Sequence, residues 1–159
     1  MKRILESGQF SNYREGVSLD SASMEVANLY KSYFGKTTVF ISHKHDDLED
    51  LSGLIGFLEK NYNVKAYIDS KDSSMPSVTS GVTASKIKER IRQCDKFILL
   101  ATDGAVESKW CNWELGYGDS QKFSSKDIAI LPLKRKGYSD SSYKGNEYMQ
   151  IYPYISFYE

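Results

Sequence analysis

The segment Lys96–Ala101 (KFILLA) decides the fold of this 159-residue chain. It is almost continuously apolar, which is typical of a strand buried on both faces of a parallel sheet. The polar residues 102–104 (TDG) form the turn that ends it. The residues before it carry apolar side chains at the spacing of one helix face: Ala84, Ile87, Ile91 and Cys94. The sequence therefore predicts a helix that packs on a central strand and buries Cys94 as a small core residue.

Three other segments predict strands of the same sheet. Thr37–Ser42 (TTVFIS) and Val64–Asp69 (VKAYID) precede the central strand, and Ile128–Leu133 (IAILPL) follows it, with Pro132 marking its end or an edge. Between the first two lies a helical stripe with two glycines that allow close packing on the sheet: Leu48, Leu51, Leu54, Ile55, Leu58, Gly53 and Gly56. This alternation predicts an α/β fold with a doubly wound parallel sheet and helices on both faces.

Both ends of the chain lack a regular pattern. Tyr148–Tyr158 predicts a last strand or an irregular edge segment, because Pro153 interrupts it. Residues 1–36 are expected to be an N-terminal extension, partly helical over Ser21–Phe34. This extension is expected to pack on a domain formed by residues 37–159.

Composition narrows the function classes. Hydrophobic residues make up 40% and charged residues 26%, which is typical of a globular domain. Lys+Arg and Asp+Glu both number 21, and this balance argues against nucleic acid as a partner and is compatible with self-association. No apolar run has the length of a membrane span or a signal peptide. The two cysteines have no metal-site spacing, so a reducing, cytoplasmic setting is expected.

The segment Ser108–Asp119 (SKWCNWELGYGD) contains both tryptophans of the chain. A helix here places Trp110 and Glu114 on the same face, one turn apart. A carboxylate beside an indole loses hydration, and such a perturbed group marks a candidate site. The alternative is an amphipathic helix with Glu114 in solvent and Trp110 in the core. The other apolar side chains are expected in two pairs: Cys111 with Leu115 in the core, and Trp113 with Tyr117 on a packing or assembly surface.

A second polar cluster, residues 42–46 (SHKHD), follows the first predicted strand. Ligands of open α/β sheets bind at the carboxyl ends of the strands. His43 and His45, with the acidic residues after them, suggest a metal site as an alternative, but no further His or Cys lies nearby, and a polar loop is favoured. Dinucleotide-binding glycine motifs, a P-loop and a nucleophile elbow are all missing from the sequence. A response-regulator receiver would need acidic residues where the first strand ends in Ser-His-Lys.

Four segments together resemble a Toll/interleukin-1 receptor (TIR) domain over about residues 37–158. They are TVFISHKHDD (38–47), VKAYIDSKD (64–72), IKERIRQCDKFILLAT (87–102) and SKWCNWEL (108–115). The resemblance implies a flavodoxin-like, five-stranded parallel sheet. Two departures are His43, in place of the usual aromatic residue, and a 70–81 loop without the Pro-Gly signature of receptor adaptors. The chain looks like the stand-alone prokaryotic type, similar to NAD-consuming signal producers of antiphage defence systems such as Thoeris.

The resemblance implies cleavage of the nicotinamide–ribose bond of NAD⁺, giving ADP-ribose or a cyclic ADP-ribose-type signal. NAD⁺ is then a substrate, and no cofactor or metal is expected. The implied partners are other TIR protomers, which assemble on activation and complete the cleft, and a downstream effector that senses the product. The implied site has one catalytic residue, Glu114, and these substrate-binding residues: Trp110, Phe40, Ile41, Ser42, His43 and Asp69. The alternatives are a non-catalytic TIR–TIR interaction module and a deoxyribosyltransferase-like enzyme.

Overall fold

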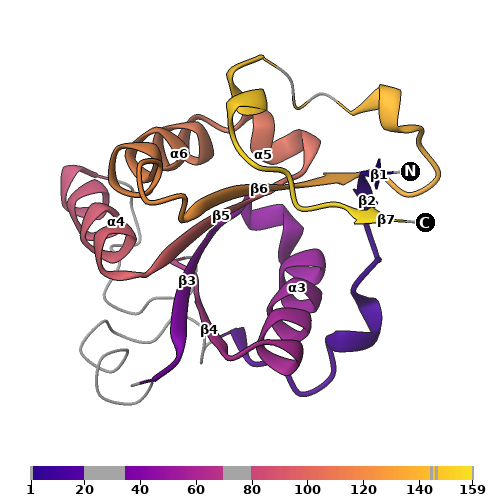
Figure 1. Ribbon diagram of the computed structural model, residues 1–159, viewed down its shortest axis with the longest axis horizontal. Coiled ribbons are helices and arrows are strands. Elements are labelled where there is room, and N and C mark those ends of the chain that lie inside the picture. Colours follow the sequence, from indigo (N-terminus) through magenta and orange to yellow (C-terminus); the bar gives the residue numbers. More distant parts are fainter. Residues whose placement is uncertain (1, 20–34, 70–79, 144, 146, 159) are drawn as a thin grey trace.

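The computed structural model describes residues 2–19, 35–69, 80–143, 145 and 147–158 (Figure 1). Five strands form one parallel sheet in the order β2-β6-β5-β3-β4. Their bounds are β2 Leu5–Glu6, β3 Thr37–Ser42, β4 Val64–Tyr67, β5 Lys96–Ala101 and β6 Ile128–Lys134. The helices are α3 Leu48–Asn61, α4 Gly81–Gln93, α5 Asp103–Glu107 and α6 Lys109–Lys122. The prediction of a doubly wound α/β fold is confirmed.

Strand alternation divides the core into two layers. Phe40 lies in the layer under α4, α5 and α6, while its neighbour Ile41 lies in the layer under α3. Figure 1 shows α3 on one face of the sheet and the other three helices on the opposite face. The Phe40 ring lies between Tyr67 and Phe97, at centroid distances of 5.7 and 5.6 Å. Cys94 is buried in the same layer, so its predicted core role is confirmed.

β6 does not end at Pro132, but the alternative prediction, an edge of the sheet at this residue, is confirmed on one side of the strand. The strand continues to Lys134, and Pro132 pairs with Ala101 of β5 inside it. Proline lacks a backbone N–H and is normally confined to places where no ladder hydrogen bond is required. The edge strand β2 joins β6 only from Leu133 onward, so it leaves the position of Pro132 unpaired on that side.

The fifth strand comes from the N-terminus, which corrects the prediction of a last strand within Tyr148–Tyr158. That segment contains a 3-10 helix, Glu147–Ile151, and then a single parallel bridge between Tyr154 and Ile130. Its irregular character is therefore confirmed. The chain ends in β7, Phe157–Tyr158, which pairs antiparallel with β1, Lys2–Arg3. Both chain ends thus lie side by side next to β6 (Figure 1).

The N-terminal segment packs against α3, and this explains the two glycines of that helix. A Cβ on Gly53 would lie 2.7 Å from the carbonyl oxygen of Phe10, and one on Gly56 would meet the backbone of Tyr13. The expectation that these glycines face the sheet is therefore wrong, because they admit the backbone of the N-terminal segment. The Phe10 and Phe57 rings add a contact with centroids 4.8 Å apart. The helix predicted over 21–34 lies outside the described residues.

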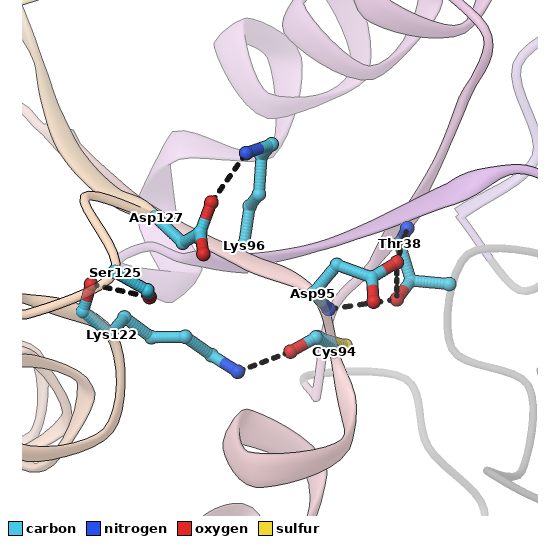
Figure 2. Close-up of polar contacts among 7 residues, drawn as sticks. All are labelled: Thr38, Cys94, Asp95, Lys96, Lys122, Ser125 and Asp127. Carbon is cyan, nitrogen blue, oxygen red and sulfur yellow. Dashed lines mark hydrogen bonds and ion pairs between the residues drawn. The ribbon is translucent and has the colours of Figure 1, made fainter.

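Polar contacts at the amino end of the sheet hold the far end of α6 (Figure 2). Lys122 donates hydrogen bonds to the carbonyl oxygens of Cys94 and, at 3.3 Å, of Arg92 at the end of α4. Desolvation by burial lowers the pKa of Lys122. Beside it, Asp95 accepts a 2.8 Å bond from the Thr38 amide. These contacts fix α6 on the sheet, so its first turns are held over the carboxyl ends of the strands.

No helix within the described residues is long and apolar enough to cross a membrane.

Candidate active site

Helix α6 forms where the sequence predicts it. Ser108 caps its first turn by accepting a 3.3 Å hydrogen bond from the amide of Cys111. Asn112 donates from Nδ2 to the Ser108 carbonyl at 2.8 Å and so fixes the same turn. Cys111 and Leu115 are buried in the core, which confirms the face assigned to them. The opposite end is held by Lys122, so the side chains between these two ends have set positions.

Glu114 is a buried carboxyl group. Only 4% of the residue is exposed, and its Oε2 has no hydrogen-bond partner within the part of the chain that the structure describes. Trp110, one turn earlier, is only partly buried. The alternative with Glu114 in solvent and Trp110 in the core is therefore wrong. An unpaired buried carboxyl is costly, which makes Glu114 unusual for a residue that only stabilises the fold.

Ser42 and Asp69 lie next to Glu114 at the ends of neighbouring strands. Phe40 pairs with Tyr67, and Ser42 ends β3 two residues after Phe40. Asp69 lies two residues after Tyr67, beyond the end of β4, so the prediction that this strand continues to Asp69 is wrong. A period of two keeps the Ser42 side chain on the face that carries Phe40, which is the face covered by α6. Asp69 lies close enough to Glu114 for its charge to act on that carboxyl. The structure therefore brings Glu114, Ser42 and Asp69 together from three separate elements.

The environment of Glu114 favours its protonated form. Burial raises the pKa of this carboxyl well above its usual range, and the charge of Asp69 raises it further. The Ser42 hydroxyl acts in the opposite direction. Ser42 is fully buried, yet neither its Oγ nor Glu114 Oε2 makes a hydrogen bond of normal geometry with any described residue. Two buried polar atoms thus meet at one place with hydrogen-bonding capacity to spare.

His43 lies at the same strand end, beside Asp69. Its Nδ1 is 3.1 Å from the carbonyl oxygen of Ile41. Burial lowers the pKa of His43, while the charges of Asp69 and Asp47 oppose that shift. The ring of His45 is 6.1 Å away, centroid to centroid. Among the described residues, no group of three His, Cys, Asp or Glu side chains is placed to hold a metal ion.

The other two predicted wall residues are fully buried. Phe40 lies in the core layer on the α6 side, two residues before Ser42 in β3. Ile41 belongs to the layer on the α3 side, so the structure does not bring its side chain to the face that carries Glu114. Of the 70–81 loop, residues 70–79 lie outside the described residues.

Trp113 contacts Trp110, a pairing that was not predicted from the sequence. The two rings are nearly perpendicular, at 86°, with centroids 5.4 Å apart. Together with Ala84 and Lys109 they line a shallow pocket of about 300 Å³. Trp113 also stacks on Tyr117, so the predicted pair is present. The signal for the first contact was the three-residue spacing of the tryptophans, which makes them neighbours on a helix.

The family model for the TIR domain matches residues 39–158. The chain belongs to the TIR domain family. A protein of Bacillus cereus (strain MSX-D12), named "Probable 3' cyclic ADP-D-ribose synthase ThsB'", is 33% identical to this TIR domain chain over 120 residues. The match covers 74% of this chain and 60% of that protein, so the chain spans less than two thirds of the relative's length. Glu114, Ser42 and Asp69 all lie within the region matched by the family model.

Proposed function

We propose that this TIR domain is an NAD⁺ glycohydrolase or cyclase that cleaves the nicotinamide–ribose bond and produces ADP-ribose or a cyclic ADP-ribose-type signal. The observation that carries the proposal is the buried Glu114 carboxyl, whose Oε2 and the nearby Ser42 Oγ have no hydrogen-bond partner among the described residues. The name of the B. cereus relative supports the same class of reaction. The product would act as a signal in antiviral defence and would be sensed by a downstream effector.

The chemistry fits a site with one principal carboxyl. Nicotinamide is cationic in NAD⁺ and leaves as a neutral molecule, so it does not need the general acid of ordinary glycosidases. The C–N bond breaks, its electron pair leaves with nicotinamide, and positive charge develops on the ribosyl group. A Glu114 carboxylate stabilises that charge electrostatically. The ribose hydroxyls would supply the hydrogen-bond partners that Oε2 and the Ser42 hydroxyl lack.

Substrate binding would also change the protonation of Glu114. The cationic nicotinamide ring favours the ionised carboxylate, which opposes the effects of burial and of Asp69 on its pKa. Glu114 would then lose its proton as NAD⁺ binds. Trp110 would give the nicotinamide ring a flat surface, with a cation–π attraction that weakens once the ring is neutral.

The other four residues assigned to substrate binding would act in two ways, either by direct contact with the substrate or by supporting a strand. His43 and Asp69 stand at the strand ends and would bound the ribose from the side away from α6. Phe40 and Ile41 would act only by supporting the strand that carries Ser42. After nicotinamide departs, capture by water gives ADP-ribose, and capture by a group of the same molecule gives a cyclic product.

The test is incubation of concentrated protein with NAD⁺, following nicotinamide release and the mass of the product. Wild type is expected to release nicotinamide, and Glu114→Gln, which keeps the shape and removes the charge, is expected to be inactive. Glu89→Gln, an exposed carboxylate of α4, serves as the matched control and should retain full activity. Equal release by wild type and Glu114→Gln would contradict the catalytic assignment.

The second candidate is a non-catalytic TIR–TIR interaction module. It is favoured by the outer face of α6, which exposes Trp113 and, between that residue and Gln121, carries a single half-buried charge at Asp119. Wild type that releases no nicotinamide at high protein concentration would support this alternative over catalysis.

A further inference from the structure

The side chain of Asn112 joins three separate parts of the chain. Its Nδ2 donates to the carbonyl oxygen of Val106 in α5 and to that of Ser108, the cap of α6, at 2.8 Å in each case. Both acceptors are carbonyl oxygens, so the nitrogen of the amide must point toward them. The Oδ1 of Asn112 accepts a hydrogen bond from the hydroxyl of Tyr148, which lies near the C-terminus.

The helix itself does not require an asparagine at this position. Asn112 is the fourth residue of α6, where asparagine is a poorer helix former than alanine because its side chain competes for backbone hydrogen bonds. Asparagine favours a helix as its cap, but Ser108 already holds the cap position. The three hydrogen bonds of the side chain therefore explain the residue better than helix formation does.

The C-terminal segment holds α6 at a second place on the same face. The hydroxyl of Tyr152, four residues after Tyr148, donates to Oδ2 of Asp119 at 2.5 Å. Asn112 and Asp119 are seven residues apart, which places them on one face of the helix, two turns from each other. Met149, between the two tyrosines, is 2% exposed and belongs to the core layer under α6. The segment is thus anchored in the core and contacts α6 along one side.

This side of α6 faces away from the candidate site. Two residues correspond to about 200° around a helix, so Asn112 and Glu114 point in nearly opposite directions. Hydrogen bonds at Asn112 resist rotation of α6 about its own axis, and such a rotation would carry Glu114 away from Ser42. We propose that Asn112, held by Tyr148, is a positioning residue that sets the rotation of the first turns of α6 and so directs Glu114 toward Ser42.

Glu114 depends on this support because no bond of its own fixes its Oε2. That atom has no hydrogen-bond partner among the described residues, so the position of the helix places it. This role rests on the proposed function, in which Glu114 stabilises charge that develops on the ribosyl group. A misplacement of about 1 Å can reduce a rate by about 10²-fold. A loosened first turn should therefore reduce kcat more than it raises KM.

The test measures kcat and KM for nicotinamide release from NAD⁺. Asn112→Ala is expected to reduce kcat by about tenfold or more, with KM changed by less than about threefold. Tyr148→Phe removes one hydroxyl and should reduce kcat by a smaller factor. Tyr154→Phe is the matched control, because the Tyr154 hydroxyl belongs to the same segment but donates to the carbonyl oxygen of Gly145, at 2.8 Å. It should keep the wild-type kcat.

A double-mutant cycle tests whether Tyr148 acts through Asn112. In the Asn112→Ala background, Tyr148→Phe should cause no further loss of kcat, whereas additive losses would contradict the coupling. Thermal unfolding followed by circular dichroism shows which variants are folded at the assay temperature. A role in folding alone would lower the melting temperature and leave the kcat of the folded variants unchanged, and this outcome would overturn the proposal.

The outcomes separate this role from the proposed function. If wild type releases nicotinamide and Asn112→Ala does so with the same kcat, the positioning role is overturned and the proposed function stands. If Asn112→Ala does not fold, equal kcat values for Tyr148→Phe and Tyr154→Phe overturn the role. A wild type that releases no nicotinamide overturns the proposed function, and the positioning role with it.

Discussion

The inner and outer faces of α6 reverse the usual polarity of a surface helix. The inner face buries the carboxyl of Glu114, and the outer face exposes the indole of Trp113 and the bare backbone of Gly116. A charged side chain on the outer face and an apolar one on the inner face would make the folded protein more stable. The helix tolerates the reversal because both of its ends are fixed, by the Ser108 cap and by Lys122. Violations of this kind are expected where function is in conflict with stability.

The largest expected effect belongs to the inner face. Glu114→Gln should reduce the rate of nicotinamide release by about 10²- to 10³-fold, the usual loss when one electrostatic stabiliser of a transition state is removed. Single-turnover measurements of nicotinamide release at saturating NAD⁺ check this value. A loss confined to KM, with kcat unchanged, would show that Glu114 binds substrate without stabilising the transition state.

Glu114→Gln should not destabilise the fold. The difference in stability between wild type and this variant should depend on pH. Because the pKa of Glu114 is raised on folding, wild type loses stability relative to Glu114→Gln as pH rises from the unfolded-state value of about 4.3 through the raised folded-state value. Below that range the two proteins should differ least. Urea unfolding at a series of pH values measures the difference, and a wild type that gains on the variant with rising pH would contradict the burial argument.

The anchored end of α6 should show the next largest effect. Lys122→Ala removes the donor from the carbonyl oxygens of Cys94 and Arg92, and an unsatisfied buried polar group costs about 1–3 kcal/mol. Denaturant unfolding should show a loss of that size. Lys126→Ala, an exposed lysine four residues later, should change stability by less than about 0.5 kcal/mol. If the two substitutions had equal effects on stability, Lys122 would not be holding the end of α6.

Sequence patterns identify the central strands, because their burial is continuous. The bounds of β3 and β5 are those predicted, since each is a run of apolar and β-branched residues with a polar end. The two-residue strand β2 carries no comparable pattern. Its position depends on contacts with β6 and α3 that are far apart in the chain, so no local signal can place it. The role of Gly53 could not be predicted for the same reason, because Phe10, which packs against it, is far away in the sequence.

The candidate site was only partly accessible from sequence. Strand-end position and helix spacing indicated Ser42, Asp69 and Glu114, together with the family resemblance. The spacing of α6 does not show whether Glu114 faces the sheet or the solvent, because that depends on which neighbouring side chains fill the core. The structure resolves the point by burying Glu114 against two strand ends. The pairing of Trp110 with Trp113 was readable from their spacing, yet a three-residue interval alone gives no ring geometry.

The charge of Asp69 should affect how the activity depends on pH. The charge of Asp69 raises the pKa of Glu114, and the Ser42 hydroxyl opposes that effect. His43, which also lies beside Asp69, and Cys111 are the other titratable groups near this pair. Asp69→Asn should therefore move the acid limb of the kcat/KM profile for NAD⁺ to lower pH, because Glu114 then ionises more readily. If the acid limb stayed at the same pH, Asp69 would have no influence on the ionisation of Glu114.

The smallest expected effects come from two glycines of α6, and they should differ in sign. Gly116→Ala adds a methyl group in open space at a helical position and should stabilise the monomer by about 0.5–1 kcal/mol. Gly118→Ala gains the same helix propensity, but its Cβ would lie 2.9 Å from the Phe97 ring, so the crowded core must shift and the net effect should be destabilising. Denaturant unfolding of both variants, at a concentration where the protein is monomeric, measures the two effects side by side. If Gly116→Ala also destabilised the protein, a packing constraint would exist at Gly116 that the open space around its position does not account for.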